Sequence, residues 1–404
     1  MARVTTAHSR GGMEIHTKIV CEELAKLGVE IHLIAPSYDG KEHDVIENGV
    51  HIYYVKAPQP RFLWNLQWSK KAYEKFIELD KRFRFDVFHS MASGGIPFLI
   101  HNCLKKGDIK KILTLHGTPI DEIKSFISVF KENKSFRNFL RIIFNLVFHL
   151  ITHPVLLIIY RNCDVIIATS KPQIKNIKKT LFVNSEKILL IQNGINTNIF
   201  SPKNIDKKIE EKLHRNSKER VIFWVGRLDK QKGVQVAING MKYILSKFPE
   251  TKLYIMGDKE GYYKEIKKMI IKLSLNKNII FLDSVNYEQL PKYINVCDIY
   301  IHPTLRDEAA PLVIIQAIAC GKPVVATNIG GIPDVILNGV NGYVFELGNS
   351  IEFSECINKI LSNDKLRNLM SHSARKIAIK NFSSVLMAKK LLDIYKNKHN
   401  NFRK

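Results

Sequence analysis

The chain has 404 residues, 45% of them hydrophobic and 25% charged, which suits two domains of ordinary size and argues against a disordered protein. Its net charge of +24, from 62 basic and 38 acidic residues, predicts attraction to polyanions such as anionic lipid or phosphate-bearing ligands. No zinc-finger or aromatic-basic strand motif accompanies that charge, so nucleic acid is not the expected partner. The six cysteines are scattered without a CxxC pair, which argues against a structural zinc site and a disulfide framework and favours a reducing cytoplasm.

In chain order, the first expected element is a short strand within Met1–His8 that leads to the paired glycines Gly11 and Gly12. No apolar segment typical of a signal peptide follows the first residues. The strand is polar for a buried central strand, which leaves open a start further upstream. A helix is expected to begin near Glu14, so that the two glycines admit a ligand against backbone amides.

Six apolar, strand-like runs follow, separated mostly by helical patterns such as Lys18–Leu27 and Ser69–Arg82. This alternation predicts a mostly parallel sheet with helices on both faces. The runs are Val29–Pro36, Val50–Ala57, Asp86–Met91, Lys111–Gly117, Asp164–Ser170 and Lys187–Gly194.

A first α/β domain is expected to span residues 1–200, after which the charged segment Ser201–Arg220 reads as a linker with a surface helix. A second series of strand-like runs predicts another doubly wound domain over residues 201–382, facing the first. A basic helix over residues 383–404 is expected to pack back on the first domain through Val385, Leu386, Leu391, Leu392 and Tyr395. The second series comprises Val221–Gly226, Lys252–Gly257, Asn278–Leu282, Asp298–Pro303, Pro323–Thr327 and Gly342–Glu346.

Ligands of doubly wound sheets bind at the carboxyl ends of the strands, where this chain places several informative residues. Arg227 and Lys232 follow the strand-like run Val221–Gly226, and a turn closed by Gly233 holds both cations. An arginine grips a phosphate with two parallel N–H bonds and a lysine adds a point charge, so the pair suits a pyrophosphate. His116 follows another strand and is itself followed by Gly117, which lets a ligand approach closely.

The segment Arg306–Asp334 is the most informative part of the sequence. Glu308 precedes Pro311, which is suited to open a helix, and the free amides of such a helix start attract phosphate. The carboxylate beside them suits sugar hydroxyls. The helix Val313–Cys320 is apolar except for Gln316, a polar side chain that needs a partner when it is buried.

These motifs together resemble the family 4 retaining glycosyltransferases of the GT-B fold, over nearly the full chain. The resemblance rests on Gly11–His16, His116–Thr118, Ala168–Ser170, Asn193–Ile195, Val225–Arg227 with Lys232 and Gly233, and His302–Asp334. It implies an α/β fold of two facing Rossmann-like domains with a deep interdomain cleft. The acceptor binds in the N-terminal domain and the nucleotide-sugar donor in the C-terminal one.

The resemblance also implies the roles of individual residues. Arg227 and Lys232 would hold the donor diphosphate, His116 would orient the donor sugar, and Glu308 would accept hydrogen bonds from its hydroxyls. All four are the expected catalytic residues. The nucleotide sugar, with UDP or GDP, would also contact Gly11, Gly12, Ala310, Leu312, Val313 and Gln316.

The expected function is therefore transfer of a sugar, with retention and without a metal ion or other cofactor, to a glycan or lipid-linked acceptor of the cell envelope. Gln316 stands where the family usually has a second glutamate that contacts the ribose, which leaves open a degenerate nucleotide-sugar binding protein. A sugar-nucleotide epimerase of the same fold is a further alternative. The expected location is cytoplasmic, with peripheral contact to an anionic membrane surface.

Two segments motivate that membrane contact. The apolar segment Phe139–Tyr160 carries polar residues every four positions, so it is either a core helix with one wet edge or an interfacial helix lying on lipid beside Lys131, Lys134 and Arg137. Its Pro154 and polar stripe argue against a transmembrane span. The loop Pro58–Trp68 adds Arg61, Phe62, Trp64 and Trp68, a mixture suited to an interface or to stacking on a sugar.

Overall fold

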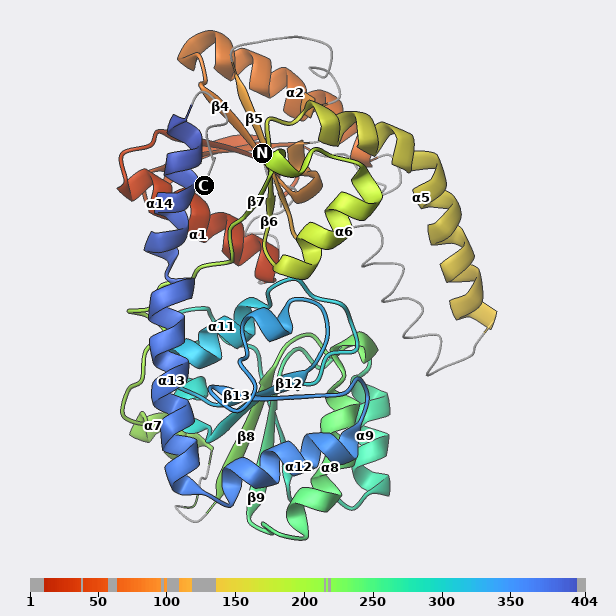
Figure 1. The fold of residues 1–404 in the computed structure, drawn as a ribbon, viewed down its shortest axis with the longest axis vertical. Coiled ribbons are helices and arrows are strands. Elements are labelled where there is room, and N and C mark those ends of the chain that lie inside the picture. The colour runs from red at the N-terminus through yellow and green to blue at the C-terminus, as the bar shows by residue number, and fades with distance from the viewer. Residues whose placement is uncertain are drawn as a thin grey trace. The chain divides into compact units, whose positions relative to one another are not determined.

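The computed structural model describes residues 11–37, 39–56, 64–95, 98–99, 109–117, 136–213, 216 and 219–397. The chain divides into two compact units (Figure 1). Unit 1 comprises Met1–Ile120, Phe144–Gly194 and Ser384–Lys404, and unit 2 comprises Asp121–Ile143 and Ile195–Ser383. The strand expected within Met1–His8 lies outside the described residues, as do Thr118, the loop residues before Trp64, and Lys131 and Lys134.

The described strands of unit 1 form two sheets. One is parallel throughout, in the order β4-β5-β6-β7, and consists of Val87–Met91, Lys110–Leu115, Val165–Ala168 and Ile188–Leu190. The other has the order β1-β3-β2, with Ile31–Pro36 parallel to Val50–Val55 and His43–Glu47 antiparallel to it. The sequence analysis missed β2, because this exposed edge strand is mostly polar and lacks the apolar run of a buried strand.

Among the residues that the structure describes, five helices belong wholly or partly to unit 1. They are α1 (Gly12–Lys26), α2 (Trp64–Phe83), α5 (Phe136–Asn162), α6 (Lys171–Leu181) and α14 (Ser384–Lys396). Helix α1 begins at Gly12, two residues before the predicted start. Helix α5 runs uninterrupted through Pro154, and part of it belongs to each unit.

Two expectations about aromatic and apolar side chains in unit 1 were wrong. Trp68 is not available for an interface or a sugar, because α2 buries it in the core with Ala72 and Phe76. Helix α14 buries Leu391 but exposes Val385, which lies on the opposite side of the helix from its packing face. A hydrogen bond joins the end of α14 to β4, because the Tyr395 hydroxyl lies 2.6 Å from Nδ1 of His89.

The described strands of unit 2 form one parallel sheet of six, in the order β10-β9-β8-β11-β12-β13. The strands are β8 (Arg220–Val225), β9 (Thr251–Met256), β10 (Ile279–Leu282), β11 (Ile299–His302), β12 (Val324–Thr327) and β13 (Gly342–Phe345). In chain order this is 3-2-1-4-5-6, the doubly wound arrangement. The direction of winding reverses between β8 and β11, so the two adjacent strand ends there are the expected ligand position.

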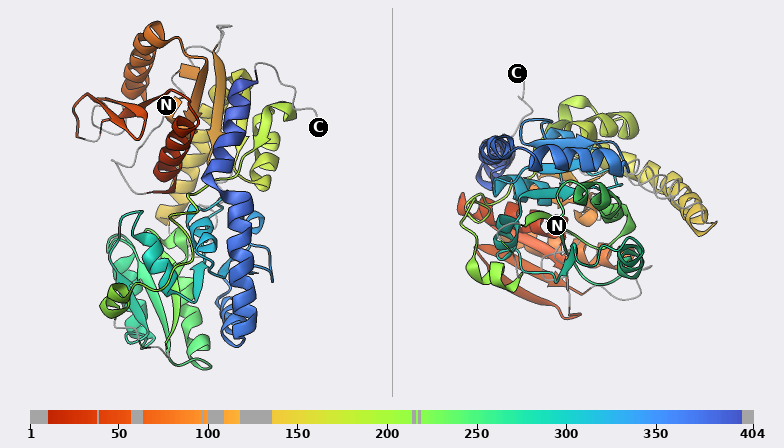
Figure 2. Two further views of the ribbon diagram at one scale, coloured as in Figure 1. Left: turned by 90° about the vertical axis from the view of Figure 1, so that its left-hand side faces the viewer. Right: turned by 90° about the horizontal axis from the view of Figure 1, so that it is seen from below.

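The helices of unit 2 lie on the faces of this sheet (Figure 2). They are α7 (Lys207–Lys212), α8 (Val234–Leu245), α9 (Tyr263–Lys272), α10 (Leu290–Val296), α11 (Leu312–Ala319), α12 (Ser350–Leu361) and α13 (Asp364–Phe382). Short 3-10 turns occur at η3 (Lys230–Lys232) and η4 (Ile332–Asp334). The core between sheet and helices includes Trp224, Met241 and Phe353. The predicted linker with a surface helix before β8 corresponds to α7.

Candidate functional site

The switch point of unit 2 brings together two residues that the sequence separates by 76 positions. Lys232, in the turn after β8, places Nζ 2.7 Å from Oε1 of Glu308, which follows β11. Thr304 donates its hydroxyl to the same carboxylate oxygen at 3.1 Å. Nε2 of the buried His302 lies 3.4 Å from the other oxygen. Both oxygens of Glu308 therefore face groups that favour a negative charge.

This arrangement determines the protonation state of Glu308. Burial by itself raises a carboxyl pKa, but the charge of Lys232 and the neighbouring His302 outweigh it and hold the Glu308 pKa well below its usual range. Glu308 is therefore an anion at neutral pH. Such a group accepts hydrogen bonds and is not a proton donor.

The turn that carries Lys232 is packed closely against the end of β11. Asp229 caps the turn by accepting from the Gln231 amide at 2.9 Å, and the Gln231 carbonyl accepts from the Leu305 amide at 2.8 Å. Gly233 closes the turn with φ of 70°, and a Cβ there would lie 1.7 Å from the carbonyl oxygen of Pro303. Glycine is therefore required at this position for both conformational and steric reasons.

A glycine turn supports Glu308 from the other side. The Gly331 amide donates to the Glu308 carbonyl at 2.8 Å. A Cβ on Gly330, whose φ is 56°, would lie 2.2 Å from Oδ1 of Asp307. The backbone on both sides of the carboxylate is therefore held by close contacts that side chains would disrupt.

Helix α11 begins at Leu312, one residue before the predicted start at Val313. Pro311 is its N-cap and Leu312 its first residue, so the amides of the first turn, including that of Val313, have no partner from a preceding turn of the helix. Ala310 and Leu312 are buried. One turn further, Gln316 is 1% exposed, and its Oε1 has no hydrogen-bond partner among the described residues.

The remaining predicted residues are divided between the units. Arg227 is exposed just beyond the carboxyl end of β8 in unit 2. In unit 1, Gly11 is the N-cap of α1 and Gly12 its first residue. His116 follows the carboxyl end of β5 and is half-buried. The structure thus brings Lys232 and Glu308 into direct contact within unit 2, while Gly11, Gly12 and His116 belong to unit 1.

His116 has a neighbour that the sequence analysis did not single out. The ring of His16, on α1, stands edge-on to the His116 ring at 4.6 Å between centroids. Burial lowers the pKa of His116 to about 4, and burial together with the nearby His116 and His89 holds the pKa of His16 well below its usual value. Both rings are therefore neutral at pH 7. His302 and Thr304 were likewise missed as partners of Glu308, although both lie within the motif His302–Asp334.

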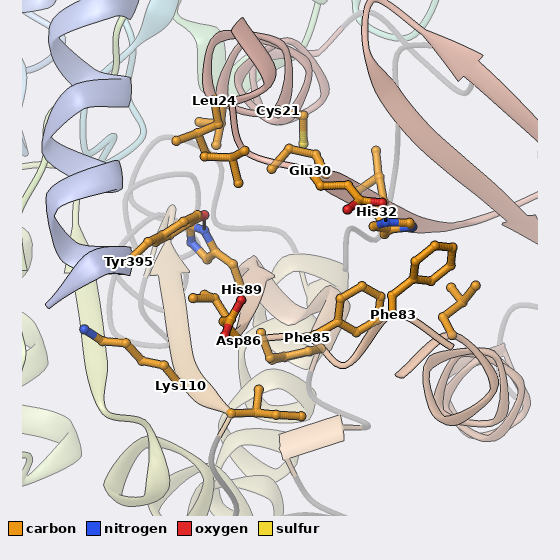
Figure 3. A pocket seen from close by; sticks show the side chains of 18 of the residues that line it. Cys21, Leu24, Glu30, His32, Phe83, Phe85, Asp86, His89, Lys110 and Tyr395 are labelled. Carbon is orange, nitrogen blue, oxygen red and sulfur yellow. Dashed lines mark hydrogen bonds and ion pairs between the residues drawn. The ribbon is translucent and has the colours of Figure 1, made fainter. Parts of the chain in front are cut away.

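Unit 1 also contains a pocket of about 1070 Å³ between β1 and β4 (Figure 3). Glu30, Asp86 and Lys110 line it from the amino ends of three strands, and His89 and Tyr395 line it from β4 and α14. Ligands of doubly wound folds bind at the opposite, carboxyl ends. This pocket is therefore separate from the predicted site residues.

Two family models match the chain. One, described as Glycosyltransferase Family 4, matches residues 10–199, and the other, described as Glycosyl transferases group 1, matches residues 205–377. The chain belongs to glycosyltransferase family 4. Its fold is the GT-B fold of two Rossmann-like domains, as the sequence predicted.

Named relatives agree with that family. An uncharacterized glycosyltransferase of Methanocaldococcus jannaschii is 28% identical over 96% of this chain and 94% of its own. The capsular polysaccharide biosynthesis glycosyltransferase CapM of Staphylococcus aureus is 32% identical over 50% of this chain and 52% of its own. The UDP-Gal:alpha-D-GlcNAc-diphosphoundecaprenol alpha-1,3-galactosyltransferase of Escherichia coli is 28% identical over 54% and 56%.

Among solved structures, a sucrose-phosphate synthase of Thermosynechococcus elongatus superimposes with a TM-score of 0.80 at 18% identity, covering 98% of this chain and 97% of that one. Anabaena HepE in complex with UDP-glucose superimposes with a TM-score of 0.75 at 18% identity, covering 97% and 98%. At this level of identity these likenesses concern the fold.

Proposed function

We propose that this glycosyltransferase transfers a sugar from a UDP- or GDP-sugar to a glycan or lipid-linked acceptor, with retention of anomeric configuration and without a metal ion. The observation that carries the proposal is the Lys232–Glu308 pair at the switch point of unit 2. A cation suited to phosphate and an acceptor that is ionised at neutral pH and suited to sugar hydroxyls are 2.7 Å apart there, as a nucleotide sugar requires.

In this proposal, the diphosphate of the donor is bound by Lys232, by Arg227 and by the free amides at the start of α11. These groups stabilise the negative charge that develops on the leaving diphosphate, which is the main electrostatic demand of the reaction. As Lys232 turns to the phosphate, Glu308 is released to accept from the sugar hydroxyls. His116, being neutral, offers the sugar one donor and one acceptor.

Relatives support the substrate classes. HepE was solved with UDP-glucose, which supports a nucleotide-sugar donor. The Escherichia coli relative is named for a diphosphoundecaprenol-linked acceptor and CapM for capsular polysaccharide synthesis. These names favour an acceptor of the cell envelope. The proposed site of action is the cytoplasmic side of the membrane.

The first test is a screen of the purified protein for binding and slow hydrolysis of UDP-, GDP- and ADP-sugars, followed by released nucleoside diphosphate. Glu308→Gln keeps the shape of the side chain but removes its charge, so we expect transfer to fall about 100-fold while nucleotide affinity is retained. Glu355→Gln, an exposed glutamate on α12, is the matched control. Full turnover in Glu308→Gln would overturn the assignment.

The buried Gln316 favours one second candidate, a nucleotide-sugar binding protein that has lost transfer. A glutamate there would accept a charge-assisted hydrogen bond, whose loss costs about 1.5–3 kcal/mol. If Gln316→Glu raises both nucleotide affinity and turnover sharply from near zero, the natural protein is a binder. Measurable turnover by the natural protein with any donor supports the enzyme instead.

A further inference from the structure

Helix α5 exposes an apolar stripe. Phe144 is 70% exposed, Val147 49% and Ile158 51%, and Pro154 is exposed as well. The spacings of three, seven and four residues place all four side chains on one face of the helix. From Phe144 to Ile158 the stripe is about 21 Å long.

A surface helix normally packs its apolar face on the core and exposes its polar face. In α5 the core contacts come from Ile159 and Tyr160, with Leu156 and Leu157 packed beside them. The side chains of Phe144 and Ile158 therefore face away from the core of unit 1, and four exposed apolar residues on one helix face exceed the scattered exposure of single apolar residues. Among the described residues, no helix is long and apolar enough to span a bilayer.

A second surface of unit 1 accompanies this stripe. Helix α6 packs on the same core cluster as the end of α5, through Ile177, and exposes Lys175, Lys178 and Lys179. No acidic residue occurs in α6. Phe182 ends the helix with φ of 46° and is 67% exposed, an aromatic side chain in solvent beside a row of lysines.

We propose that α5 and α6 form a docking surface for an anionic lipid bilayer, with the α5 stripe and Phe182 at the level of the acyl boundary and the α6 lysines at the headgroups. Apolar side chains alone would equally suit a second copy of the chain. The charge favours lipid, because two copies would bring together surfaces that are both basic, in a protein whose net charge is +24. Anionic lipid attracts the same surface.

The test is sedimentation of the full-length protein with vesicles, without donor or acceptor, so that its result is independent of the proposed transfer. We expect binding to vesicles of phosphatidylglycerol and phosphatidylcholine at low salt, weaker binding at high salt, and little binding to phosphatidylcholine alone. Phe144→Glu with Val147→Glu is expected to reduce binding at least about tenfold. Its control is Ile271→Glu on α9 of unit 2, an apolar residue that is 62% exposed.

The lysines are tested by replacing Lys175, Lys178 and Lys179 with glutamine, which is expected to weaken binding about fivefold per lysine. The control with the same loss of charge replaces the exposed lysines of α9, Lys264, Lys267 and Lys268. All replaced side chains are exposed, so circular dichroism and melting temperature should stay unchanged.

Two results would overturn the proposal. One is equal weakening by the α6 and α9 lysine sets, which would mean that only the net charge attracts the protein. The other is no vesicle binding together with a concentration-dependent dimer in analytical ultracentrifugation that Phe144→Glu dissociates, which would assign the stripe to a second copy of the chain.

Discussion

Replacing Lys232 by methionine removes the cation from Glu308 and leaves its carboxylate with Thr304 and His302. Exposed ion pairs contribute less than about 1 kcal/mol, whereas loss of one partner of a fully buried pair costs about 3–5 kcal/mol. Here the two side chains are 24% and 14% exposed. We therefore expect Lys232→Met to lower the free energy of unfolding of unit 2 by about 2 kcal/mol.

A double-mutant cycle with Lys232→Met and Glu308→Gln isolates the pair. Native-state hydrogen exchange of peptides from β8 and β11 reports the stability of unit 2. The two changes should couple by about 1.5–2 kcal/mol. The control is Lys259→Met, because Lys259 lies at the same 2.7 Å from Asp283 but on the surface, and no measurable change is expected there. A coupling below about 0.5 kcal/mol would refute the reasoning.

The same pair predicts a pH dependence. The folded-state pKa of Glu308 is depressed, so its stabilising contribution is present above the unfolded value of about 4.3 and is lost as the pH falls toward the folded value. The stability difference between the natural protein and Lys232→Met should therefore shrink as the pH is lowered through this range. A difference that grows in acid would contradict the assignment of Glu308 as the anion of the pair.

Two further predictions concern backbone geometry and acid stability. Gly233→Ala should destabilise unit 2 by about 3 kcal/mol, because alanine is strained in the left-handed conformation and its Cβ would overlap the Pro303 carbonyl oxygen. Gly339→Ala, with φ of 81° and open space around it, should cost only about 1–2 kcal/mol. Equal unfolding midpoints of the two variants in urea would contradict this prediction. Burial lowers the pKa of His16, His89 and His116, so these side chains stay neutral when folded but protonate when unfolded. The free energy of unfolding of unit 1 should fall by up to about 1.4 kcal/mol per histidine for each pH unit below about 6.5. If native-state hydrogen exchange shows that unit 2 loses protection before unit 1 between about pH 6.5 and 5, the prediction is contradicted.

The six described strands of unit 2 were predictable from sequence, because a strand buried on both faces of a parallel sheet is an almost continuous apolar run. Which strand ends are neighbours was not predictable from the runs alone. The order β9-β8-β11 places Lys232 beside Glu308, and this depends on how the chain winds. For the same reason His302 and Thr304 were missed as partners of the carboxylate.

Unit 1 was less predictable, and the reasons differ from element to element. The edge strand β2 consists mostly of polar residues, a pattern that is typical of a loop. Trp68 looked like an exposed aromatic because an aromatic residue near a basic loop has the same local pattern whether its helix turns it inward or outward. The α5 segment was correctly read as a helix, but only the structure shows that Phe144, Val147 and Ile158 are exposed while Ile159 and Tyr160 contact the core.

The C-terminal helix α14 also has a consequence for biosynthesis. It packs on α1, and Tyr395 bonds His89 while Met387 accepts from the Gly194 amide, so unit 1 is completed by a segment that is synthesised after the main segment of unit 2. Domains usually fold in the order of their synthesis. In this protein unit 2, whose main segment ends at Ser383, has all its strands available first. The His89 face of unit 1 stays uncovered until α14 has been synthesised, and during this interval the nascent chain most needs protection from aggregation.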